Sequence, residues 1–339
     1  MRDFSCFGDG AVNLAVGGGG GGCGAGGGAL DRSLQAATAS VYRVALASRK
    51  ELRIKVTWTR SAAGAAAAGG AAATGLAVAI DDGSRVSPTA AAVGTPRRGA
   101  AALMPAGAQH LLQKKRGSRS FVSEAGTAVT IYWDTADAKY PAASGSPSPS
   151  PEPSRDYYLA VVADAELALL LGGGEAAREL ARRFAPAPRR ALLSRREQVR
   201  APFASPAPAA QLVHTTRCRF RDDGAEHEVT VACRGEEWGS RDGEVAVSVD
   251  GKKVVEARRV KWNFRGNRTA VLGDGAVVEV MWDVHDWWFA GVPGGGGGAQ
   301  FMVKARGAAD GGRVWMDEEM AKKGQAPGGF FLHLQCYRR

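Results

Sequence analysis

Asp283, His285 and Asp286 are the residues whose types and spacing come closest to those of a catalytic or metal site. A histidine between carboxylates can serve as a general base or as part of a metal-binding cluster. A metal site needs further ligands, and no second histidine lies nearby in the sequence. We therefore interpret these residues as solvated side chains at a strand end, and we assign no catalytic residue, metal ligand or cofactor. Enzyme chemistry confined to this second half of the chain is kept as an alternative.

The segment that contains these residues occurs twice. The later copy reads Val280-Met281-Trp282-Asp283-Val284-His285-Asp286, and the earlier copy reads Ile131-Tyr132-Trp133-Asp134-Thr135-Ala136-Asp137. Each follows an R-G-x-R sequence at the same spacing, Arg116-Gly117-Ser118-Arg119 or Arg265-Gly266-Asn267-Arg268. Because the earlier copy lacks a histidine, the repeated pattern indicates a duplicated structure and weakens the enzyme interpretation.

Each copy is expected to form a β-hairpin, and the position of its turn sets the register of the two strands. With the turns centred on Ala125 and Asp274, an arginine faces an aspartate and a glycine faces a tryptophan in both hairpins. The expected pairs are Arg116 with Asp134, Gly117 with Trp133, Arg265 with Asp283, and Gly266 with Trp282. The indole would then occupy the space that the glycine leaves open, while the ion pair would lie on the opposite surface.

Arg119 and Arg268 are candidate ligand-binding residues. By strand alternation they share the face of the tryptophans, which is expected to be the core, and an unpaired buried charge is very costly. A bulge could turn each arginine outward, or an internal carboxylate could pair with it. Alternatively, each arginine lines a cavity inside a barrel that carries a small anionic apolar ligand.

Trp287 and Trp288 are candidate interaction residues. They precede Phe289, and three adjacent aromatic side chains cannot all point into one core if the chain is extended. An exposed tryptophan would be a recognition anchor for a partner protein. The alternative is that the segment curls and buries all three aromatic residues.

Basic and aromatic residues alternate between Arg258 and Arg268, a pattern also found where proteins stack nucleic-acid bases. The alternation puts Trp262 and Phe264 on one face of a strand, which favours a half-buried strand. The formal net charge of +10 is modest for 339 residues, so nucleic-acid binding is disfavoured and an unknown protein partner is favoured. The remaining histidines are scattered and are expected at the surface or as satisfied core residues: His110, His214, His227 and His333.

Alternation of apolar with polar or small residues recurs along the chain and marks half-buried strands. Two helices are expected, at residues 175–184 and 316–323, each followed by one closing strand. The expected fold class is all-β, with two duplicated antiparallel β-barrel- or β-sandwich-like domains. Each domain is expected to have one short helix before its last strand.

Low-complexity segments rich in glycine, alanine, proline and serine divide the chain. We expect a flexible Gly-rich tail at 1–35 and a first β repeat with low-complexity loops at 36–200. A Pro/Ala linker at 201–210 would then lead to a second β repeat at 211–339.

No stretch of about 20 uncharged apolar residues is present, so no membrane span is expected. The five cysteines are odd in number and never spaced as C-x-x-C, which is typical of reduced thiols. These features favour a cytoplasmic or nuclear location.

Several segments resemble the plant domain-of-unknown-function 868 family. They are Met1 to Gly8, Val56 to Trp58, Tyr157 to Val162, Lys261 to Asn267 and Val278 to Phe289. The resemblance covers most of the chain outside the low-complexity loops. It implies a land-plant protein, and it implies no activity, cofactor or catalytic residue. We expect an intracellular plant protein that works as a non-enzymatic binding or protein-interaction module.

Overall fold

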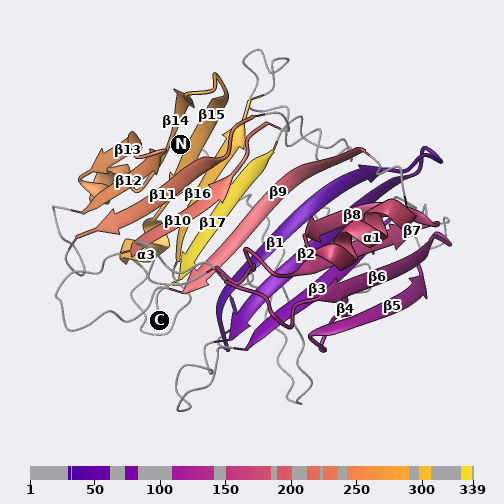
Figure 1. Cartoon of the computed structure of the whole chain (residues 1–339). Helices are drawn as coiled ribbons and strands as arrows, with labels where there is room; N and C mark the ends of the chain where they lie inside the picture. Colours follow the sequence, from indigo (N-terminus) through magenta and orange to yellow (C-terminus); the bar gives the residue numbers. More distant parts are fainter. Residues whose placement is uncertain are drawn as a thin grey trace, which may run out of the picture.

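The computed structural model describes residues 30–31, 33–61, 73–82, 109–140, 150–184, 189–200, 212–221, 224–235, 243–289, 298–306 and 330–337. These residues are mostly strands, which form three sheets, with three short helices between them (Figure 1). The all-β class expected from the alternation is therefore confirmed.

The largest sheet has nine strands in the order β14-β15-β16-β17-β9-β1-β2-β3-β4. Their bounds are Arg265–Val271, Val277–Asp283, Gly298–Ala305, Phe331–Tyr337, Arg189–Arg200, Leu34–Ala45, Glu51–Ser61, Thr74–Asp81 and His110–Leu111. Neighbouring strands are antiparallel except β17 and β9, which are parallel. This parallel pair joins strands from both halves of the chain into one continuous sheet.

Two smaller antiparallel sheets have four strands each. One contains β5 (Arg116–Val122), β6 (Ala128–Asp134), β7 (Tyr158–Ala163) and β8 (Glu166–Gly172) in sequence order. The other contains β10 (Leu212–Cys218), β11 (His227–Arg234), β12 (Glu244–Val249) and β13 (Lys252–Arg258). In Figure 1 both smaller sheets lie in front of the nine-stranded sheet.

Both smaller sheets cover the same face of the nine-stranded sheet, which we call the inner face. Trp58, Thr38, Glu197, Leu334 and Phe301 are in register across five neighbouring strands, so their side chains share one face. Trp58 packs in a core with residues of β6 to β8, whereas Leu334 and Phe301 pack in a second core with residues of β10 to β13. The molecule is therefore two β-sandwiches side by side that share one large sheet.

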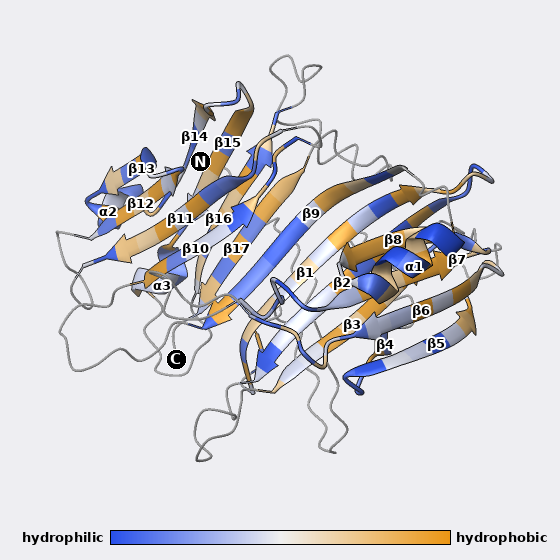
Figure 2. Cartoon of the chain, viewed as in Figure 1, coloured by the Kyte–Doolittle hydropathy of each residue, from blue (hydrophilic) through white to orange (hydrophobic). Residues whose placement is uncertain are grey.

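The strand β9 lies between these two cores and differs in composition from its neighbours. Figure 2 shows a long hydrophilic stretch along β9, flanked by more apolar strands. Its sequence, RRALLSRREQVR, places charged residues on both faces of the sheet. Polar groups are therefore brought to the junction of the two cores.

The helices are short. The helix α1 (Glu175–Arg183) confirms the helix expected at 175–184 and packs on the outside of β7 and β8 through Leu180, Ala181 and Phe184. The helices α2 (Val260–Asn263) and α3 (His285–Phe289) flank the hairpin of β14 and β15. The helix expected at 316–323 and the linker expected at 201–210 lie outside the described residues.

Two expectations about the fold are wrong. None of the sheets formed by the described strands closes into a barrel, because β9 pairs with β1 and β17 and extends an open sheet. The strand expected through Trp262 and Phe264 is instead the helical turn α2, which Phe264 caps. There Arg259 adopts a left-handed conformation, with φ of 55° and ψ of 54°, as the chain leaves β13 of the small sheet and crosses to β14 of the large one.

Candidate functional site

The two repeated hairpins, β5–β6 and β14–β15, have the register expected from the sequence. Arg116 pairs with Asp134 and Gly117 with Trp133 in the first hairpin. Arg265 pairs with Asp283 and Gly266 with Trp282 in the second.

The indole hydrogen bonds of the two hairpins also match. The Trp133 Nε1 donates to the carbonyl of Lys114 at 2.7 Å, and the Trp282 Nε1 donates to the carbonyl of Asn263 at 3.1 Å. Both accepting residues stand two positions before the R-G-x-R arginine. The turn glycines Gly126 and Gly275 have positive φ angles of 83° and 80°, which a glycine adopts without strain.

The glycines opposite the indoles are needed for space. A Cβ atom added at Gly117 would lie 2.9 Å from Trp133 Cζ2, and one added at Gly266 would lie 2.5 Å from Trp282 Cη2. Both distances are shorter than ordinary contacts between carbon atoms. Packing, rather than ligand binding, accounts for the repeated glycine and tryptophan.

The repeated arginine and aspartate form ion pairs on the opposite surface. The Arg116 Nε lies 2.6 Å from Asp134 Oδ2, and the Arg265 Nε lies 2.7 Å from Asp283 Oδ2. Asp283 Oδ1 also accepts a hydrogen bond from the backbone N–H of His285. Both carboxylate oxygens of Asp283, which the enzyme interpretation would need for catalysis, therefore already bind groups of the protein itself.

His285 and Asp286 do not form a catalytic pair within a cleft. His285 Nδ1 lies 2.9 Å from Asp286 Oδ1, and both side chains are well exposed at the start of α3. Only Asp283 of the three residues lines the pocket found in this part of the molecule. The described residues hold no group of three or more His, Cys, Asp or Glu side chains that could bind a metal ion.

Arg268 lies on the inner face of the nine-stranded sheet and Arg119 on the core-facing side of its small sheet, as expected, but both side chains are exposed. Arg119 is in register with the buried Ile131 and Arg268 with the buried Val280, and no bulge interrupts either hairpin. Both arginines are exposed, because β5 and β14 are edge strands and the long side chains reach solvent beyond the sheet edge. Arg268 Nη1 reaches the carbonyl of Val254 on the facing sheet at 3.4 Å. The described strands form no closed barrel around these arginines, and their role in ligand binding stays a prediction.

Trp287 and Trp288 are buried, with 2% and 5% of their surfaces exposed. The segment curls into α3 and packs both indoles into the core of the second sandwich, so neither is an exposed recognition anchor. Among the tryptophans that the structure describes, Trp262 on α2 is the exposed one, with 78% of its surface accessible. Sequence reasoning missed it because alternation placed Trp262 in a strand.

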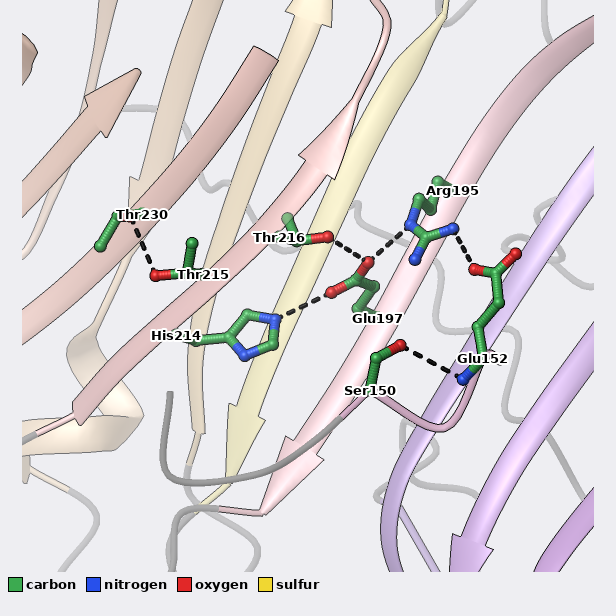
Figure 3. Close-up of polar contacts among 8 residues, drawn as sticks. All are labelled: Ser150, Glu152, Arg195, Glu197, His214, Thr215, Thr216 and Thr230. Carbon is green, nitrogen blue, oxygen red and sulfur yellow. Dashed lines mark hydrogen bonds and ion pairs between the residues drawn. The ribbon is translucent and has the colours of Figure 1, made fainter. Parts of the chain in front are cut away.

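A cluster of buried and partly buried polar side chains lies on the inner face where the two cores adjoin (Figure 3). This seam cluster consists of Glu152, Arg195, Glu197, His214 and Thr216. Arg195 and Glu197 come from β9, His214 and Thr216 from β10, and Glu152 precedes β7. Each pair on a strand is two residues apart, which puts both side chains on one face.

Glu197 is at the centre of the seam cluster. Its Oε1 accepts hydrogen bonds from Arg195 Nε and Thr216 Oγ1, both at 2.6 Å, and its Oε2 lies 2.8 Å from His214 Nε2. Arg195 Nη1 donates to Glu152 as well. The cluster therefore links the large sheet to a strand of one small sheet and to the segment that enters the other.

Neighbouring groups keep the Glu197 carboxylate of the seam cluster ionised. Burial opposes ionisation of Glu197, but the Arg195 charge and the hydrogen bonds from His214 and Thr216 outweigh it and keep the Glu197 pKa far below its usual value. A carboxylate with such a low pKa and both oxygens occupied cannot serve as a general base near neutral pH. We assign the seam cluster a structural role.

The seam cluster could not be found from sequence. Residues 152, 195 and 214 meet only because β9 joins two sandwiches, and β9 lacks the apolar alternation that marks an ordinary strand. His214 is a satisfied core residue, as expected from its isolation in the sequence.

None of the described helices is long and apolar enough to cross a membrane. Among curated proteins, none matches the chain. One solved structure is similar to it, a protein from Nitrosomonas europaea described as a "putative AttH", with 11% identity over 83% of this chain and 91% of that chain. Its TM-score of 0.24 is too low to support an argument.

The model of one protein family matches residues 33–337, which include every described strand. That family is described as plant protein of unknown function, DUF868. The chain belongs to the DUF868 family of plant proteins.

Proposed function

We propose that this protein is a non-enzymatic protein-interaction module whose contact surface is the turn α2. The observation that carries the proposal is the exposure of Trp262, of which 78% is accessible to solvent. A tryptophan is the residue most often found as an energetic anchor in protein interfaces. Folding leaves this indole unburied, so its large apolar surface is available to a partner.

The turn presents Trp262 on a fixed backbone. Val260 is buried in the core of the second sandwich and anchors the start of α2. Asn263 Nδ2 donates to the carbonyl of Arg258 at 2.7 Å, and the carbonyl of Asn263 accepts the Trp282 indole N–H. A fixed backbone lowers the entropy that is lost when a partner binds.

The charges around Trp262 favour an acidic partner. Arg259 and Lys261 precede it in the sequence and are exposed. Arg258 is exposed as well but pairs with Glu256 at 2.9 Å. Single-stranded nucleic acid binds by stacking successive bases on several aromatic side chains, and this turn offers only one. An acidic protein segment therefore fits the turn better than single-stranded nucleic acid does.

Affinity capture from plant tissue tests the proposal with a matched pair of variants. Trp262→Ala removes the anchor, whereas Val271→Ala changes another exposed apolar residue, 69% accessible, on the nearby strand β14. We expect Trp262→Ala to lose one or a few proteins that the parent and Val271→Ala both retain. Recovery of the same proteins with all three baits would refute the role of Trp262.

The proposed location is cytoplasmic or nuclear. The cysteines Cys218 and Cys336 are buried free thiols, which supports a reducing compartment.

The two sandwiches are also proposed to descend from one duplicated unit. The common register, the paired indole hydrogen bonds and the equivalent turn glycines support this origin. The duplicated unit would be a sandwich of two four-stranded sheets, with β9 as the element that joins the copies.

A further inference from the structure

The outer face of the nine-stranded sheet, opposite the two smaller sheets, carries a small pocket. Met281, Met302 and His333 lie in register on β15, β16 and β17, so their side chains stand side by side on this face. All three line the pocket, together with Gln300, Arg265 and Asp283. The accessible surface of the pocket is mostly apolar.

His333 is the polar group of this pocket that lacks a partner. Only 4% of its surface is exposed, and within the described part of the chain its Nδ1 has no hydrogen-bond partner. Burial and the nearby Arg196 charge lower the pKa of His333 to about 3, so the imidazole is neutral at physiological pH. A buried polar atom without a partner is costly and normally indicates a water, an ion or a ligand.

A positively charged side chain lies next to His333. Arg196 on β9 is in register with His333, and its charge lowers the pKa of both His333 and Lys55. The Asp283 carboxylate at the edge of the pocket is offset by its ion pair with Arg265. Glu279, on the same face, lies 3.7 Å from Arg306.

We infer that this pocket binds an amphipathic organic anion, with its charged group beside His333 and Arg196 and its apolar part over Met281 and Met302. A neutral imidazole can donate a hydrogen bond to an anion, and the arginine supplies the charge. The two methionines are flexible and polarisable, which suits an apolar ligand of variable shape.

The size of the pocket limits how the ligand is bound. Its volume of about 20 Å³ exceeds the space that one water molecule needs but is far below that of a whole ligand. Only the charged group enters, and the apolar part lies across the open surface of the sheet. The site is independent of α2, because none of its lining residues belongs to that turn.

Methyl resonances of methionine provide the test on the full chain. The protein is labelled with [¹³C-methyl]methionine, and Met281 and Met302 are assigned with Met→Leu variants. Octanoate, octanol and octyltrimethylammonium are then titrated below their micelle concentrations. We expect octanoate to shift the Met281 and Met302 signals saturably and at least about tenfold more tightly than the other two, which corresponds to one charge-assisted contact.

An Arg196→Gln variant separates charge recognition from apolar adsorption. We expect it to weaken octanoate binding about tenfold, whereas Arg43→Gln on the same face, remote from the pocket, leaves it unchanged. The four other methionines of the chain serve as internal references. Absence of shifts at Met281 and Met302, or equal affinity for the anionic and cationic amphiphiles, would overturn the inference. An Arg196→Gln variant that is folded and binds octanoate as well as the parent would do so too.

Discussion

The most specific consequence of the repeated hairpins is that the glycine opposite each indole cannot be enlarged without loss of stability. In Gly266→Ala the new Cβ would lie 2.5 Å from Trp282 Cη2 and closer still to Cζ2. The indole cannot move away freely, because its N–H donates to the Asn263 carbonyl.

The expected loss follows from two opposing effects. Overpacking of this kind typically costs about 1–3 kcal/mol. Replacing glycine by alanine also restricts the unfolded chain, which stabilises by about 0.4–1 kcal/mol. We therefore expect Gly266→Ala to lower the free energy of unfolding by about 1–2 kcal/mol. Gly117→Ala should have the same sign, because Trp133 is buried and held by its bond to Lys114.

Urea denaturation measures the loss, and two comparisons test its cause. Gly273→Ala lies in the same hairpin with nothing within 4 Å of its added Cβ, so it should cost less than about 0.5 kcal/mol. In a Trp282→Phe background the smaller ring should relieve the clash, so Gly266→Ala should cost at least about 1 kcal/mol less there. Equal losses in both backgrounds, or a neutral Gly266→Ala, would refute the packing account.

Three further predictions concern the seam cluster, the buried thiols and the exposed ion pair. Glu197→Gln should lower the free energy of unfolding by about 3 kcal/mol, because it leaves the largely buried Arg195 charge with less compensation. A loss below about 1 kcal/mol would contradict this. Since the Glu197 pKa is lowered by folding, its contribution is present above the usual value of 4.5 and is lost as the pH falls below it. The parent should therefore lose stability in acid more steeply than Glu197→Gln in urea titrations at each pH. Burial raises the pKa of the Cys218 and Cys336 thiols to about 12. Iodoacetamide at pH 8 should therefore modify them at least about a hundredfold faster in unfolded than in native protein. Equal rates of modification would count against the burial of these thiols. Arg265→Ala should lower the free energy of unfolding by less than about 1 kcal/mol, because the ion pair with Asp283 is partly exposed. A loss as large as that of Glu197→Gln would show that the pair is more than a surface interaction.

The hairpin register could be predicted because it depends on local sequence alone. A turn glycine and the fixed spacing between Arg265 and Asp283 determine which residues face each other. The same reasoning placed Arg119 and Arg268 on the correct face. It could not tell that both strands are sheet edges, where a long side chain escapes to solvent, because edge position depends on distant strands.

Other features could not be predicted because they depend on how the sheets are connected. Alternation makes Trp262 look like a strand residue, but the chain must cross between sheets there and turns at Arg259. Trp287 and Trp288 are buried by one helical turn that no local signal marks clearly. The parallel pairing of β9 with β17, which opens the expected barrel into a shared sheet, joins residues more than a hundred positions apart.

Site-specific photo-crosslinking tests most directly whether the α2 turn is the contact surface. A photoreactive phenylalanine derivative is placed at position 261 in one protein, next to the intact Trp262, and at position 271 in another, since Lys261 and Val271 are both exposed. The two proteins are irradiated in plant extract. We expect a discrete covalent adduct with an acidic protein from position 261 and none from position 271. No adduct at position 261, or the same adducts from both positions, would contradict the proposed interaction surface.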